Sequence, residues 1–183
     1  MKPEKELVVR PAARADIAAI TSIYAHAVAH GVASFELTPP NEAEMTRRFE
    51  AIASAGYPYL VAERGGEILG YAYLSAYRSR PAYKSTVENS IYVSPKAQRL
   101  GTGRILLAEL ISKAESLGYR QIIAVIGDSA NSPSINLHRA MGFTFAGTLH
   151  SVGFKHGRWL DSVLMQLAVG EGDSTAPTIV PKA

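Results

Sequence analysis

The sequence predicts one mixed α/β domain over residues 1–168, and three observations support this prediction. Short β-rich runs alternate along the chain with segments whose apolar residues recur at helical intervals. A length of 183 residues suits a single domain, and no internal repeat divides it. The last segment, 169–183, is polar and contains Gly and Pro, so we expect a disordered tail there.

The N-terminal half is predicted to hold strands and helices joined by a proline-containing loop. Asp16 is placed to begin a helix that ends near Gly31, and Asn41 is placed to begin a second one. Gly65 and Gly66 allow a tight hairpin turn between two β-rich runs. Strands are predicted at 7–10, 59–63 and 68–75, and helices at 17–31 and 41–55.

The C-terminal half begins with a strand that runs directly into a glycine loop and a helix. The run RQIIAVIG at 120–127 is short and nearly continuously apolar, which is typical of a buried strand in a mixed sheet. Strands are predicted at 87–93, 120–127, 144–150 and 158–169, and helices at about 102–118 and 132–142.

Bulk composition excludes several classes of function. The chain has no Cys, so disulfides, thiolate catalysis and cysteine-bound metals are excluded. No apolar run is long enough to span a membrane, and the N-terminus lacks a signal-peptide core, so we expect a cytoplasmic protein. The net charge of +3 is mild, and no basic stripe interleaves with aromatics, which argues against nucleic-acid binding.

The stretch SPKAQRLGTGRILL, from Ser94, has the features of an anion-binding loop. A nucleoside-triphosphate loop would need Gly-Lys-Ser/Thr, but Gly103 is followed by Arg104. A dinucleotide fingerprint would need a small residue at position 106, where Leu106 stands. Free N–H groups at a helix start, with no side chains at Gly101 and Gly103, would still admit a pyrophosphate. Arg99 and Arg104 could add charged hydrogen bonds.

A carboxylate lies within the β-rich run TVENSIYV. Strand alternation puts Glu88, Ser90 and Tyr92 on one face. Burial there would raise the pKa of Glu88 into a range useful to a general base. From its position alone, Glu88 could equally be an exposed strand residue or an ion-pair partner of Arg78 or Arg80. Of the histidines, only His26 and His30 have a metal-like spacing, and without a third ligand no metal site is predicted.

Four motifs in this order resemble the GNAT superfamily of acyl-CoA-dependent N-acetyltransferases. Its signature Q/R-x-x-G-x-G/A matches Gln98 to Gly103, although many relatives have Gly where Arg99 stands. Within the superfamily, the chain resembles phosphinothricin and methionine sulfoximine N-acetyltransferases. The motifs that carry the resemblance are RSRPAY at 78–83, TVENSIYV at 86–93, INLHRAMGF at 135–143 and VGFKHGRWLDSVLMQ at 152–166.

The resemblance implies a mostly antiparallel central sheet flanked by helices on both faces, and direct acetyl transfer to the α-amine of an amino-acid-like acceptor. It implies that Glu88 is the general base. It also implies that His138 stands where many members have a Tyr general acid, and that it acts either as a second acid/base or as a group that orients the substrate. It also implies a homodimer. Residues implied to bind acetyl-CoA are Ile91, Tyr92, Val93, Gln98, Arg99, Leu100, Gly101, Thr102, Gly103, Arg104 and Asn131. Residues implied to bind the acceptor are Phe35, Arg78, Arg80, Tyr83, Glu88, Asn89 and Ser90.

Two other functions remain open at this stage. The acceptor could be a different amine, such as a protein N-terminus or another small amine, although a cationic acceptor would call for carboxylates. The chain could also be a non-catalytic acyl-CoA-binding module. Glu88 argues against that, because a module that only binds has no need of a carboxylate in this strand.

Overall fold

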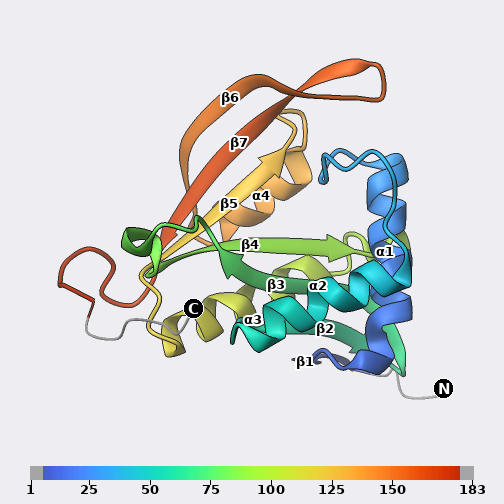
Figure 1. Ribbon diagram of the computed structural model, residues 1–183, viewed down its shortest axis with the longest axis horizontal. Coiled ribbons are helices and arrows are strands. Elements are labelled where there is room, and N and C mark those ends of the chain that lie inside the picture. Colours follow the sequence, from blue (N-terminus) through green and yellow to red (C-terminus); the bar gives the residue numbers. More distant parts are fainter. Residues whose placement is uncertain (1–5, 178–183) are drawn as a thin grey trace.

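The computed structural model describes residues 6–177, and these form one sheet with helices on both of its faces (Figure 1). The sheet has seven strands in the order β1-β2-β3-β4-β5-β7-β6. Only β4 and β5 run parallel to each other; every other neighbouring pair is antiparallel. The predicted mixed, mostly antiparallel sheet is therefore confirmed. Its strands are β1 (Leu7–Pro11), β2 (Tyr59–Arg64), β3 (Glu67–Ala76), β4 (Thr86–Val93), β5 (Gln121–Gly127), β6 (Thr144–Lys155) and β7 (Arg158–Ala168).

Each face of the sheet buries its own apolar cluster. Helix α3 (Thr102–Ser116) covers one face with Leu106, Leu107 and Leu110, and α4 (Ser132–Ala140) adds partly buried residues to the same cluster. Helices α1 (Ile17–His30) and α2 (Glu42–Ser54) cover the other face, where Tyr59 and Tyr71 are stacked. Alternate residues of each strand thus enter different cores, which fixes the strand register.

The helix starts show why the two predicted caps behave differently. The side chain of Asn41 accepts a hydrogen bond from the Glu44 N–H, as an N-cap residue does. Asp16 occupies the predicted N-cap position of α1, but its side chain makes no capping hydrogen bond to that helix. Its carboxylate instead accepts from the Ala13 N–H and from the Arg10 guanidinium, which lowers the pKa of Asp16. The ion pair ties β1 to the start of α1.

The β6–β7 hairpin extends beyond the rest of the sheet (Figure 1). β6 was predicted to end at residue 150 but continues to Lys155, with two register shifts against β7. At the other end of β7, residues 169–177 form turns that Arg120 contacts through the Gly172 and Ala176 carbonyls. The rest of the predicted disordered tail, 178–183, lies outside the described residues.

Candidate active site

The central feature of the site is a split between the two parallel strands. β4 and β5 are paired only from Thr86 with Gln121 to Asn89 with Ala124. Beyond that point β4 continues to Val93 and β5 to Gly127 without pairing to each other. The β5-facing edge of the second half of β4 is therefore free of strand pairing, and an extended ligand can hydrogen-bond there as an added strand would.

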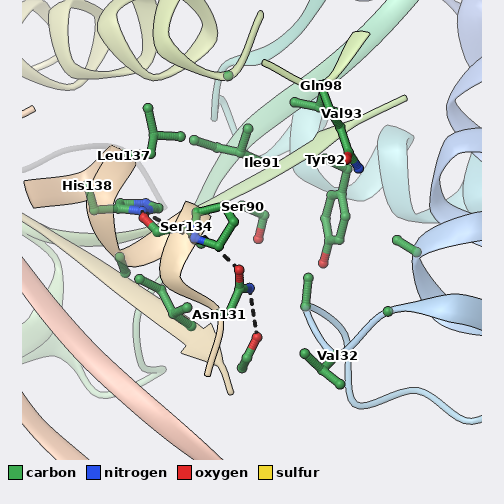
Figure 2. A pocket seen from close by; sticks show the side chains of 18 of the residues that line it. Val32, Ser90, Ile91, Tyr92, Val93, Gln98, Asn131, Ser134, Leu137 and His138 are labelled. Atoms are coloured by element: carbon green, nitrogen blue, oxygen red, sulfur yellow. Dashed lines mark hydrogen bonds between the residues drawn. The ribbon is translucent and has the colours of Figure 1, made fainter. Parts of the chain in front are cut away.

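A cavity of about 810 Å³ occupies this split and reaches both faces of the sheet. Figure 2 shows Ile91 and Leu137 on one side of β4, and the Tyr92 side chain pointing to the side where Val32 lies. The predicted residues that line the cavity are Asn89, Ser90, Ile91, Tyr92, Val93, Gln98, Arg99, Gly101, Thr102, Gly103, Arg104, Asn131 and His138.

The glycine loop bounds one end of the cavity and opens α3. Gly101 has φ 82°, a left-handed conformation that glycine adopts without strain. Arg99 has φ 62° and takes the same conformation at the position where relatives often have Gly. A Cβ on Gly103 would lie 3.2 Å from Leu137 Cδ2, so the missing side chain lets α3 approach α4 closely. The unpaired N–H groups of the first turn of α3 then face the cavity, where an anion is favoured.

Helix α4 contributes the polar groups on the opposite wall. Asn131 caps the helix by accepting from the Ser134 N–H, and its Nδ2 donates to the Gly127 carbonyl at 3.0 Å. His138 is only 4% exposed and contacts Asn89 across the cavity wall, with 3.0 Å between His138 Nε2 and Asn89 Nδ2. Burial lowers the pKa of His138, so its imidazole is neutral near pH 7.

Glu88 lies one residue before the apex of the split. It is half-buried, it shares a strand face with Ser90 and Tyr92, and it does not line the cavity itself. Burial raises the pKa of Glu88. The side chain lies on the α1 side of the sheet, the face that also carries Tyr92.

Several predicted residues lie outside the cavity. Arg78, Arg80 and Tyr83 belong to the loop between β3 and β4, where the Arg78 guanidinium lies 5.6 Å from the centre of the Tyr83 ring. Arg78 and Arg80 are exposed, and so is Leu100 of the glycine loop. The described contacts thus do not place the arginine loop in the cavity, although the loop leads into the end of β4 that carries Glu88.

Phe35 fills a notch formed by two glycines. A Cβ on Gly153 would lie 2.5 Å from Phe35 Cε2, and a Cβ on Gly127 would clash with the same ring. Lys155 is 4% exposed and donates from Nζ to the Ser34 carbonyl at 2.7 Å. These contacts fasten the loop after α1 to the β6–β7 hairpin. Val32, which lines the cavity, belongs to the same loop.

Sequence reasoning missed some cavity residues. His26 and His30, with ring centroids 4.7 Å apart, line the cavity, and so does Arg158 at the start of β7, which is paired with the buried Asp128. Exposed polar residues carry no periodicity or motif in the sequence that would mark them as lining a cavity. In the described part of the chain, no group of three or more His, Asp or Glu side chains could hold a metal ion. No helix within residues 6–177 is long and apolar enough to cross a membrane.

The split between the parallel strands offers an extended ligand a free strand edge, and the glycine-lined start of α3 offers an anion site at its end. The family model for the acetyltransferase (GNAT) domain matches residues 9–164, and the chain belongs to this family.

The chain is similar to specific members of the family over nearly its whole length. A phosphinothricin N-acetyltransferase of Alcaligenes faecalis is 54% identical over 162 residues, which are 88% of this chain and 82% of the relative. An L-methionine sulfoximine/L-methionine sulfone acetyltransferase of Salmonella typhimurium is 42% identical over 165 residues, which are 90% of this chain and 96% of the relative. A GNAT phosphinothricin acetyltransferase of Sinorhizobium meliloti, solved in complex with acetyl-CoA, has 50% identity and a TM-score of 0.92, and the match covers 96% of this chain and 95% of that structure.

Proposed function

We propose that this protein is an acetyl-CoA-dependent N-acetyltransferase that acetylates the α-amine of an amino acid or analogue, such as phosphinothricin or methionine sulfoximine. The observation that carries the proposal is the β4–β5 split, which meets the glycine-lined start of α3 in one cavity. The similarity to acetyltransferases named for these acceptors supports the substrate class. A role in resistance to such toxic amino-acid analogues would follow from this activity.

The residues present fit acetyl-CoA. The N–H groups of the first turn of α3, with Arg99 and Arg104 nearby, would hold the pyrophosphate. The free edge of β4 at Ile91 and Val93 would pair with the amides of the pantetheine arm, and Asn131 lies on the facing wall. A backbone N–H near Tyr92 would support the thioester oxygen. When bound, acetyl-CoA supplies the acetyl group as an activated thioester.

Glu88 is proposed as the general base. An α-amine has a pKa of roughly 8, so most of it carries a proton at neutral pH and must lose that proton before it can attack. The half-buried carboxylate lies next to the apex of the split, and burial raises its pKa toward the working pH. It can take the proton directly or through one water. Because the chain has no Cys, we propose direct transfer, without an acetylated thiol on the enzyme.

The acceptor is proposed to bind on the α1 side of β4, where Ser90 and Tyr92 face the cavity. Arg78 and Arg80 are proposed to clamp the acidic group of the acceptor, because guanidinium groups bind carboxylate and phosphinate oxygens bidentately. In the described structure both are exposed, so the clamp requires the loop to close over the acceptor. Phe35 and Tyr83 are proposed to line the same side.

An acceptor panel tests the proposed function. Purified protein is mixed with acetyl-CoA and, separately, with phosphinothricin, methionine sulfoximine, methionine sulfone, a polyamine and a peptide with a free N-terminus, and release of free CoA is followed. We expect release with the acidic amino-acid analogues. Release with the polyamine or the peptide alone would indicate a different amine acceptor. Binding of acetyl-CoA with no release in any mixture would favour a non-catalytic module.

A homodimer is also proposed, and the β6–β7 hairpin supports it. The hairpin exposes large apolar side chains, which single chains seldom leave in contact with water as a group. They are Phe145, Leu149, Val152, Phe154 and Trp159. Light scattering should give the mass of two chains, and Trp159→Glu with Phe154→Glu should reduce it to one.

A further inference from the structure

Asn89 lies at the apex of the split, because its pairing with Ala124 is the last one between β4 and β5. If the proposed function holds, the pyrophosphate lies at the start of α3 beside Val93, and the substrate arm runs back along β4. The reactive end of the donor substrate then reaches Asn89 and the imidazole of His138, which both line the cavity.

The hydrogen bonds of His138 determine its tautomer. His138 Nδ1 lies 2.8 Å from the Ser134 carbonyl oxygen, which can only accept, so Nδ1 carries the hydrogen. Because burial lowers the pKa of the imidazole, it is neutral, and Nε2 has no hydrogen. Asn89 Nδ2, 3.0 Å away, therefore donates to Nε2. Turning the amide over would place Oδ1 against Nε2, which would require a charged imidazolium in a buried site.

The other end of the Asn89 amide has no partner. Asn89 is 6% exposed, and its Oδ1 is buried with no hydrogen bond from any of the described residues 6–177. A buried acceptor without a donor costs free energy, so Oδ1 of this cavity-lining side chain is an available acceptor for a donor group of a bound ligand. The thioester substrate carries N–H groups, and its thiol product carries an S–H group in addition, so both can supply such a donor.

We propose that Asn89 is a positioning and binding residue. Its Nδ2 holds His138 as a neutral hydrogen-bond acceptor with Nε2 unprotonated, and its Oδ1 accepts a hydrogen bond from an N–H or S–H group at the reactive end of the bound donor substrate. In this arrangement His138 has no proton on the cavity side. It therefore orients groups at the apex and does not serve as the acid that protonates the departing thiolate.

The tautomer is tested by nitrogen NMR of the imidazole in ¹⁵N-labelled protein without ligand, which is independent of any transfer activity. The wild type should show His138 with a protonated Nδ1 and an unprotonated Nε2 near pH 7. Asn89→Asp keeps an acceptor oxygen and replaces the donor with a second acceptor, so His138 should carry a hydrogen on both nitrogens. Asn136→Asp is the matched control, because it adds the same charge at an exposed site of α4.

Two results would overturn the positioning role. One is a protonated Nε2 in the wild type at neutral pH. The other is an Asn89→Asp spectrum that does not differ from that of Asn136→Asp. If Asn89→Leu does not fold, the isosteric Asn89→Asp variant still decides whether Asn89 positions His138.

The binding role is tested by calorimetry with acetyl-CoA and with CoA. Loss of one hydrogen bond should weaken affinity about tenfold in Asn89→Leu, whereas Asn89→Asp should retain most of the affinity. Weaker binding of both probes identifies an N–H donor, and weaker binding of CoA alone identifies the thiol S–H. Unchanged affinity for both probes in a folded Asn89→Leu variant would refute the Oδ1 contact. Absence of transfer in the wild type would instead count against the proposed function and leave the NMR result standing.

Discussion

Gly153→Ala should release Phe35 from its notch and loosen the loop that carries Val32. The added methyl group would lie 2.5 Å from Phe35 Cε2 and 2.6 Å from Cδ2, too close for both to remain in place. The neighbouring Lys155 is bonded to the same loop, so the backbone of β6 cannot move away freely. We therefore expect the Phe35 ring to leave the notch between Gly127 and Gly153.

The size of the effect follows from the burial of Phe35, which is 38% exposed. A fully buried Phe removes roughly 200 Å² from water, so about three fifths of that, or roughly 120 Å², is at stake. At about 25 cal/mol per Å² the loss is at most about 3 kcal/mol. For a chain of this length, each kcal/mol lowers the Tm by about 2–4 °C.

Thermal unfolding and steady-state kinetics provide the assay, with Gly147→Ala as the control. Gly147 lies on the same strand, and a Cβ there would meet nothing within 4 Å. Gly153→Ala should lower the Tm and raise the KM for the acceptor, with the affinity for acetyl-CoA retained. Equal Tm and KM values for the two variants would refute the argument that Phe35, packed in the notch, holds this loop in place.

Three further predictions concern Glu88 and the glycine loop. Glu88→Gln should cut kcat by about 10²–10⁴-fold with unchanged acetyl-CoA affinity, and equal loss of both would make Glu88 structural. Because burial raises the folded-state pKa of Glu88, the stability it contributes is present below its unfolded-state pKa and lost as the pH rises through the raised value. Glu88→Gln should therefore raise the Tm at neutral pH but not in acid. Thermal unfolding of both proteins across a pH series measures the difference, and a variant Tm below that of the wild type at neutral pH would contradict the prediction. Gly101→Ala, at φ 82° in open space, should cost about 1–2 kcal/mol of stability, whereas Gly103→Ala, which pushes on Leu137, should mainly weaken acetyl-CoA binding. Calorimetry and melting curves separate the two variants, and the reverse pattern would refute the argument.

The fold was largely predictable because the signals were local. Hydrophobic periodicity, the Asn41 cap and the Gly65-Gly66 turn each depend on a few consecutive residues, and they gave the right elements in the right order. Two details were not predictable. The carboxylate of Asp16 is engaged by Arg10 of β1, and β6 is extended by register shifts against β7; both depend on side chains or strands that meet only once two elements have packed together.

The site was predictable where one segment carries it and not where several segments meet. The glycine loop and TVENSIYV indicated the cavity from short motifs. The link between Asn89 and His138 joins residues 49 positions apart, and the notch for Phe35 joins three separate segments. The left-handed Arg99 was also not predictable, because nothing local requires a bulky residue to take that conformation.

The most direct test of the central claim is the identity of the acetylated product. Phosphinothricin and the same compound with its α-amine blocked are each incubated with acetyl-CoA and the protein, and the products are analysed by fragment mass spectrometry. The proposed function predicts one added acetyl group, on the α-nitrogen, with the free amine alone. An acetyl group elsewhere, or no product despite acetyl-CoA binding in the β4–β5 split, would contradict it.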